Sequence, residues 1–322
     1  MSGDTVRVWN SADVAPDYAR CADSTRVLLR DLIDYAGLFP PASLSMSQSV
    51  ANFDAYLQSE WSWILGRLVV PVARLDGFET ALAELAPLPS ASGLVEYRLS
   101  VLLGADVTAD VTSIRLFNDR MAKSGFHKTA VIESVEAKVA SAEEIGRLSA
   151  VIPAELETYF ELPLSNCDEC IIAVSEFGRR AKIRTGGETA DKFPASDGVI
   201  EFIRFCAAAR VPFKATAGLH HPIRSAHRLT YHPESASGMM HGFLNVFLAA
   251  AFLWAGMEAK LAVQLLEEQS AQDFRFELDD VAWREYRLSR NEIASARAHF
   301  AISFGSCSFT EPIDDLRSLN LL

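Results

Sequence analysis

The sequence predicts an α/β protein folded as a (β/α)8 TIM barrel. Short apolar runs typical of buried strands alternate with segments of helical spacing, and seven strand candidates occur between Leu32 and Leu219. The last two candidates are joined by a helix-length connection, which implies a right-handed parallel crossover. The chain of 322 residues also exceeds the roughly 250 that such a barrel needs.

The elements follow in order from the amino terminus. Residues 28–42 are predicted as a helix that passes into a short apolar strand, which Pro40 and Pro41 end. A Ser-rich start at residue 45 opens an amphipathic helix that runs to residue 63. Further strands are predicted at 66–72, 96–104, 127–135 and 157–164, and further helices at 78–85, 114–123, 143–148, 167–177 and 198–210.

The alternation of predicted strands and helices becomes less regular after Pro222. We expect a long loop at 224–240, a long apolar helix or helix pair at 242–268, the eighth strand at 274–278 and a helix at 289–300. Ser289 and Glu292 have the spacing of a capping box at the start of that last helix. The prediction is a single domain over residues 1–322, with an amino-terminal arm, a barrel core at about 28–280 and a C-terminal helical extension at about 281–322.

Composition narrows the class of partner. A net charge of −12 and a pI near 5.1 argue against a nucleic-acid or acidic membrane surface. The most apolar run, residues 242–257, is short for a membrane span and contains Asn245. The polar start of the chain resembles no signal peptide, and an odd number of cysteines, five, suggests reduced thiols. We expect a cytoplasmic protein that binds a small molecule, and a homo-oligomer is compatible with the sequence.

Two lysines mark the candidate site. Lys182 in AKIRTGG and Lys214 in VPFKATAG each lie near the carboxyl end of a predicted strand, where barrels keep their chemistry. Burial or a second cation lowers the pKa of a lysine, so that its neutral amine can attack a carbonyl and form a Schiff base. Such an iminium stabilises a carbanion on the next carbon. The competing interpretation is that both lysines bind an anion or face solvent.

These segments resemble the class I deoxyribose-phosphate aldolase family, a group of (β/α)8 barrels. AKIRTGG is similar to the family's Lys-Thr-Ser-Thr-Gly strand, which carries the Schiff-base lysine, and FKATAGL is similar to its Lys-Ala-Ser-Gly-Gly strand. LIDYAGLFPPA resembles the family's opening strand, in which an aspartate precedes a short apolar run and a turn. The lysines are 32 positions apart, close to the family's spacing, and the resemblance spans Leu28 to His221.

The resemblance implies roles for particular residues. Lys182 would form the Schiff base, Lys214 would lower its pKa, and Asp34 would be the acid of the first strand, although a cap or salt bridge is the simpler reading of Asp34 by itself. Substrate-binding residues are expected in the turns after both strands: Arg184, Thr185, Gly186, Gly187, Thr216 and Gly218. By strand alternation Arg184 shares a face with Lys182, where it would bind a substrate carboxylate and help keep Lys182 neutral.

The chain also departs from the family's pattern. The family has a proton-shuttling aspartate in its fourth strand, whereas residues 127–135 offer only Lys128 and Glu133. Glu161, Glu133 or His220 could carry protons instead, and for each of them a structural role is an equally simple reading. The spacing of the histidines between His220 and His241 matches no metal motif, so no metal or other cofactor is expected.

The leading hypothesis is therefore an aldolase-type lyase that uses a lysine Schiff base on a small carbonyl compound carrying a carboxylate or phosphate. Two alternatives stay open: a metal-assisted hydrolase or isomerase on the same barrel, and a barrel that binds a small anion without catalysis.

Overall fold

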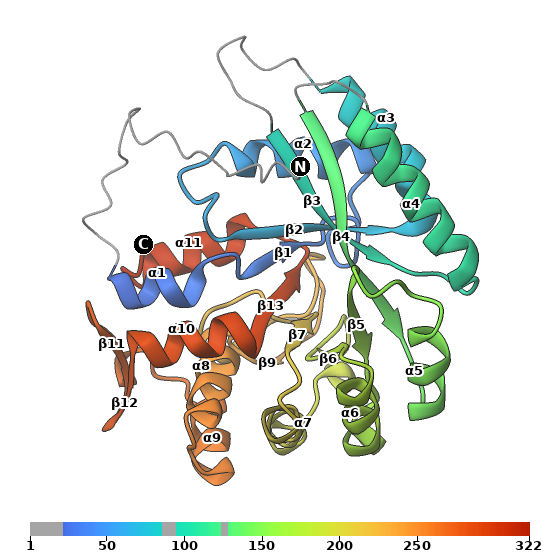
Figure 1. Cartoon of the computed structure of the whole chain (residues 1–322). Coiled ribbons are helices and arrows are strands. Elements are labelled where there is room, and N and C mark those ends of the chain that lie inside the picture. The colour runs from blue at the N-terminus through green and yellow to red at the C-terminus, as the bar shows by residue number, and fades with distance from the viewer. Residues whose placement is uncertain (1–21, 86–94, 124–127) are drawn as a thin grey trace, which may run out of the picture.

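The computed structural model describes residues 22–85, 95–123 and 128–322. Eight parallel strands close into a barrel, and helices surround it (Figure 1). The predicted (β/α)8 barrel is confirmed. The predicted amino-terminal arm lies almost entirely outside the described residues.

Seven barrel strands agree in place with the predicted ones. They are β1 (Ile33–Tyr35), β2 (Leu65–Pro71), β3 (Val95–Leu102), β4 (Lys128–Lys138), β5 (Glu157–Glu161), β6 (Arg180–Arg184) and β7 (Phe213–Thr216). β2 is buried along almost its whole length, as expected for a strand of a parallel sheet whose two faces are both covered. β4 is longer than predicted and continues three residues past Val135, which matters for the site.

Helices follow the strands and pack around the barrel (Figure 1). They are α2 (Met46–Leu57), α3 (Leu75–Glu84), α4 (Val107–Lys123), α5 (Ala142–Ser149), α6 (Cys167–Glu176) and α7 (Ser196–Ala209), and α1 (Asp23–Leu29) precedes β1. The Ser-rich start of α2 forms a capping box, in which Ser45 and Gln48 satisfy each other's backbone N–H groups.

The eighth strand is not the predicted one. β13 (Ala301–Ser306) closes the barrel between β1 and β7. The predicted segment instead forms β10 (Phe274–Phe276), which pairs antiparallel with β11 (Asp280–Trp283), and β11 pairs with β12 (Tyr286–Ser289). The barrel therefore extends to Ser306, and the region expected to be a helical extension contains its last strand.

That last strand is flanked by two helices, α10 (Arg290–His299) before it and α11 (Thr310–Ser318) after it. The predicted capping box at Ser289 and Glu292 begins α10. The predicted long loop after Pro222 contains a β-hairpin, β8 (Ser225–Arg228) and β9 (Ser237–Met240).

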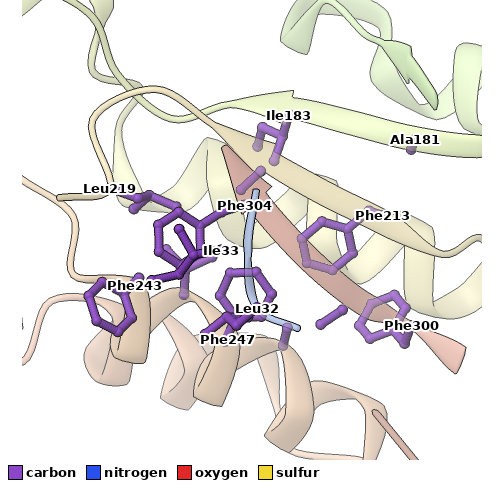
Figure 2. Close-up of a cluster of buried hydrophobic side chains, with 14 of the residues drawn as sticks. Leu32, Ile33, Ala181, Ile183, Phe213, Leu219, Phe243, Phe247, Phe300 and Phe304 are labelled. Atoms are coloured by element: carbon purple, nitrogen blue, oxygen red, sulfur yellow. The ribbon is translucent and has the colours of Figure 1, made fainter. Parts of the chain in front are cut away.

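The long apolar segment is a pair of helices, α8 (Phe243–Trp254) and α9 (Ala259–Leu266), as predicted. Phe243 of α8 stacks on Phe304 of β13 with ring centroids 5.1 Å apart. Phe247 of α8 stacks on Phe213 of β7 with ring centroids 6.5 Å apart (Figure 2). This aromatic layer fixes β7 and β13 against α8. Within the described ranges, no helix is both long and apolar enough to cross a membrane.

Candidate active site

Lys182 and Lys214 lie on adjacent strands and point into the same cavity. They are direct register partners of β6 and β7, and their side chains are 7 % and 1 % exposed. Both line a cavity of about 260 Å³, here called the lysine pocket. The turns after β1, β6 and β7 contribute to its wall, so the pocket lies at the carboxyl end of the barrel, where (β/α)8 enzymes bind substrate.

Glu136 of β4 joins the two lysines. Its Oε2 lies 2.8 Å from Lys182 Nζ and its Oε1 lies 2.7 Å from Lys214 Nζ. The carboxylate is buried and also accepts a hydrogen bond of 2.7 Å from Ser100 Oγ. One carboxylate therefore holds both amines on the floor of one pocket.

Each lysine has a second acidic partner. Asp34 Oδ2 lies 2.6 Å from Lys214 Nζ, and Glu161 Oε2 lies 2.8 Å from Lys182 Nζ. Asp34 is buried; its Oδ2 also accepts from Ser303 Oγ at 2.8 Å. The result is a chain of alternating charges from Asp34 through both lysines and Glu136 to Glu161.

These carboxylates reverse the expected effect on the lysine pKa values. Burial acting by itself would lower the pKa of Lys182, but Glu136 and Glu161 outweigh burial and raise it above its ordinary value. Burial likewise disfavours the Lys214 ammonium, and Asp34 and Glu136 overcome it and raise that pKa. The expectation that Lys214 and Arg184 keep Lys182 neutral is therefore wrong, because three carboxylates surround the two ammonium groups.

The same contacts hold the acids ionised. Burial would raise the pKa of Glu136, but Lys182 and Lys214 pull it well below its usual range. Burial is also outweighed at Asp34, where Lys214 and Arg67 lower the pKa. Asp34 and Glu136 therefore stay ionised beside the two ammonium groups, with a carboxylate within 2.8 Å of each amine.

Part of the predicted substrate-binding set lines the pocket. Arg184, Gly187, Thr216 and Gly218 do so. Arg184 follows Lys182 by two positions and, as expected from alternation, opens toward the same cavity. It has no acidic partner within 4.0 Å among the described residues. Its guanidinium is therefore free to bind an anionic group of a ligand.

Two other members of that set have structural contacts. The Thr185 hydroxyl donates to the backbone carbonyls of Thr216 and Ala217 at 3.1 and 2.8 Å, which ties the two turns together. A Cβ atom on Gly186 would lie 2.6 Å from the Phe193 ring, so this glycine makes room for an aromatic side chain. Neither residue is among those that line the lysine pocket.

His220 lies at the mouth of the pocket, and its Nδ1 is 3.1 Å from Glu311 Oε2 of α11. His221 Nδ1 lies 2.6 Å from Asp315 Oδ2, and His241 contacts Arg224 and the carbonyl of Pro194. In the part of the chain that the structure describes, no group of three or more His, Cys, Asp or Glu side chains is arranged to hold a metal ion.

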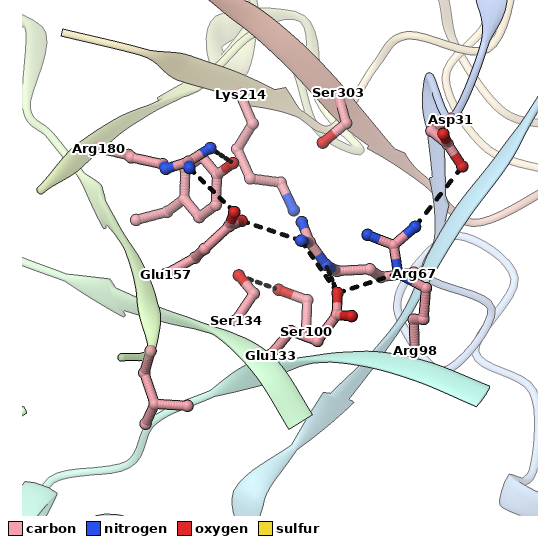
Figure 3. Close-up of polar contacts among 12 residues, drawn as sticks. Asp31, Arg67, Arg98, Ser100, Glu133, Ser134, Glu157, Arg180, Lys214 and Ser303 are labelled. Atoms are coloured by element: carbon pink, nitrogen blue, oxygen red, sulfur yellow. Dashed lines mark hydrogen bonds and ion pairs between the residues drawn. The ribbon is translucent and has the colours of Figure 1, made fainter. Parts of the chain in front are cut away.

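Glu133 is not brought together with the lysines. It lies in the middle of β4, where Arg67 and Arg98 bind its carboxylate at 3.2 and 3.0 Å (Figure 3). The predicted proton carriers thus separate: Glu161 and His220 line the lysine pocket, and Glu133 belongs to another network.

Sequence reasoning missed Glu136 and Ser303. The fourth strand was predicted to end at Val135, whereas β4 continues to Lys138 and includes Glu136. Ser303 lies on the eighth strand, which was predicted elsewhere. Extending the period-2 pattern of VIESVEAKV to its last residue would have found Glu136.

No protein-family model matches this chain, and no curated protein sequence does. The function must therefore be argued from the geometry of the lysine pocket.

Proposed function

We propose that this protein is a class I, Schiff-base aldolase-like lyase acting on a small carbonyl compound. The observation that carries the proposal is Glu136, which bridges two buried lysines at the carboxyl end of a parallel barrel. It also supplies an acid in the fourth strand, where the deoxyribose-phosphate aldolase family has its aspartate. Asp34, Lys182 and Lys214, the three polar residues to which the resemblance gave catalytic roles, belong to one cluster with Glu136, which supports the proposal.

Lys182 is the nucleophile in this proposal. Its partner Glu161 lines the pocket, whereas the Lys214 side chain is almost fully enclosed. Its ammonium first gives a proton to Glu161 or Glu136, each 2.8 Å away. The neutral amine then adds to the substrate carbonyl carbon, the protonated carboxylate returns its proton to the carbinolamine hydroxyl, and water leaves. The product iminium is again a cation, so the carboxylates that favour the ammonium also stabilise it.

The bond between the carbon next to the iminium carbon and the carbon that bears the hydroxyl then breaks. Its electron pair moves into the iminium to give an enamine, and the hydroxyl of the leaving fragment gives its proton to Glu161 or Glu136 as that fragment becomes a carbonyl. His220 at the pocket mouth is a further candidate carrier. Arg184 would orient a carboxylate or phosphate of the substrate.

Borohydride trapping tests the proposal. Small aldehydes and keto acids should each be incubated with the protein and borohydride, and the modified residue located by mass spectrometry. We expect an adduct on Lys182 that disappears in Lys182→Met and persists in Lys192→Met, which changes an exposed lysine near the same turns. Absence of any Lys182 adduct with a compound shown to bind would reject the proposal.

A barrel that binds a small anion without catalysis is the second candidate. The complete pairing of both ammonium groups with carboxylates favours it, since neither amine is free at rest. Binding without a trapped adduct would support this candidate. The metal-assisted alternative gains no support from the described histidines, because His220 and His221 each face an acid from α11.

A cytoplasmic location is part of the proposal. The four cysteines in the described ranges, Cys167, Cys170, Cys206 and Cys307, are all free thiols, which suits a reducing compartment. Burial raises the pKa of Cys167 and of Cys170, so this pair is poorly suited to redox chemistry.

A further inference from the structure

A second cavity opens at the opposite, amino-terminal end of the barrel. Its volume is about 500 Å³, and five arginines line it, so we call it the arginine cavity: Arg30, Arg67, Arg98, Arg180 and Arg297. It shares no lining residue with the lysine pocket. Asp34 and Ser303 belong to its wall, and Asp34 also contacts Lys214.

Three of the arginines are neutralised by acids. Arg67 contacts Glu133 and Glu157 at 3.2 and 2.9 Å. Arg98 contacts Glu133 and Asp31, and Arg180 contacts Glu157 at 2.9 Å (Figure 3). These three cations and three carboxylates balance, and the carboxylate of Asp34 is matched by Lys214.

Arg297 and Arg30 are left over. Neither has a carboxylate oxygen within 4.0 Å among the described residues. Four N–H groups of Arg297 point at backbone carbonyls, those of Leu28, Arg30, Ala301 and Ile302, which leaves one N–H on Nη2. Burial lowers the pKa of Arg297 to about 10, and the more distant carboxylates of Asp31 and Asp34 offset only part of that effect.

Both unmatched arginines line the arginine cavity. Arg297 Nη2 donates to the backbone carbonyl of Arg30 at 2.8 Å, and the exposed Arg30 side chain has no hydrogen-bond acceptor among the described residues. Arg297 is half-buried, so an anion that enters the cavity would offset the cost of desolvating its guanidinium. The chain as a whole carries −12, so a local excess of two positive charges is not a general property of its surface.

We propose that the arginine cavity binds a small doubly charged oxyanion, a phosphate group, through Arg30 and Arg297. Guanidinium groups match the geometry and charge of phosphate. The competing explanation is that the arginines only stabilise the closed end of the barrel, as residues at this end of (β/α)8 barrels commonly do. The two cavities share no lining residue, but Asp34 of the arginine cavity contacts Lys214 of the lysine pocket at 2.6 Å, so the test must separate the two sites.

Calorimetric titration with inorganic phosphate, at fixed ionic strength against chloride, tests this proposal. We expect one saturable site in the wild type and an affinity about tenfold weaker in Arg30→Gln, the loss of one charge-assisted contact. Arg30 is exposed, so this variant should fold. Arg115→Gln makes the same change on the exposed face of α4 and should bind like the wild type.

Arg184→Gln separates this site from the lysine pocket, because it removes the guanidinium that would bind a substrate anion there. The phosphate binding that Arg30→Gln weakens should persist in Arg184→Gln. No saturable binding in the wild type, unchanged binding in Arg30→Gln, or loss of all binding in Arg184→Gln would each overturn the proposal. Phenyl phosphate identifies the form of the ligand: tighter binding than inorganic phosphate supports an esterified group, and equal binding supports the free ion.

Discussion

Glu136 contacts both lysine amines, so the protonation of Lys182 and that of Lys214 are linked through one carboxylate. A reaction at Lys182 that moves a proton onto Glu136 also weakens the attraction that holds Lys214. Each side chain of the cluster is therefore expected to influence the others, and single substitutions will not act independently.

Glu161→Gln should make Lys182 more reactive at neutral pH. Removing one of two carboxylates at 2.8 Å lowers the pKa of Lys182. The pH profile of borohydride trapping should therefore move to lower pH. Turnover should fall if Glu161 also carries the substrate proton.

Glu188→Gln is the matched control. Glu188 lines the same pocket, but no ion pair joins it to either lysine. Its trapping profile should coincide with that of the wild type. A profile for Glu161→Gln that stays in place, or moves to higher pH, would contradict the electrostatic account of the cluster.

Lys214→Met should destabilise the fold. It leaves the buried carboxylates of Asp34 and Glu136 without their shared cation, and breaking a buried pair from one side costs about 3–5 kcal/mol. Urea unfolding measures the loss. Adding Asp34→Asn to this variant should recover part of it, since one of the unpaired charges is gone; a double variant no more stable than Lys214→Met would argue against this reading.

At the scale of elements, the sequence predicted those strands whose residues are apolar and bounded by turns. β1 to β7 fit that description. β13 escaped prediction because AISFGS is rich in small residues, whereas the aromatic segment at 274–278 looks more like a strand. The hairpin of β8 and β9 escaped because its strands are four residues long and largely polar.

Local pattern also could not indicate which charged residues meet. Lys182, Lys214 and Arg184 were predicted together because they lie on neighbouring strands with similar turns. Glu136 comes from β4, three strands from β7 in the barrel order, so its contact with Lys214 depends on barrel closure. Glu133 and Glu136 lie three positions apart on one strand but contact different cations, Arg67 and Arg98 for Glu133 and the two lysines for Glu136.

Ser289→Ala should lower the stability of α10, the helix that contains Arg297 and precedes β13. Ser289 accepts from the Glu292 backbone N–H, and loss of such a cap costs about 1 kcal/mol. Urea unfolding of Ser113→Ala, an exposed serine inside α4, provides the control and should show no loss. Equal stability of Ser289→Ala and the wild type would show that packing alone sets the start of α10.

For the whole molecule, the ionised cluster should set a pH window of stability. The pKa of Glu136 is lowered in the folded state from an ordinary 4.5, so its contribution is present above about pH 4.5 and lost as the pH falls further. The pKa values of both lysines are raised from 10.5, so their contribution is complete below 10.5 and lost as the pH rises through the folded values.

Glu136→Gln tests this window, because it removes the carboxylate that both lysines share. The free energy of unfolding, measured in urea across the pH range, should be lower than in the wild type, by most between about pH 4.5 and 10.5. The difference should shrink in acid, where Glu136 of the wild type is itself losing its charge, and in strong alkali, where the lysines lose theirs. A difference independent of pH would mean that Glu136 stabilises the barrel by packing and hydrogen bonding, and not by its charge.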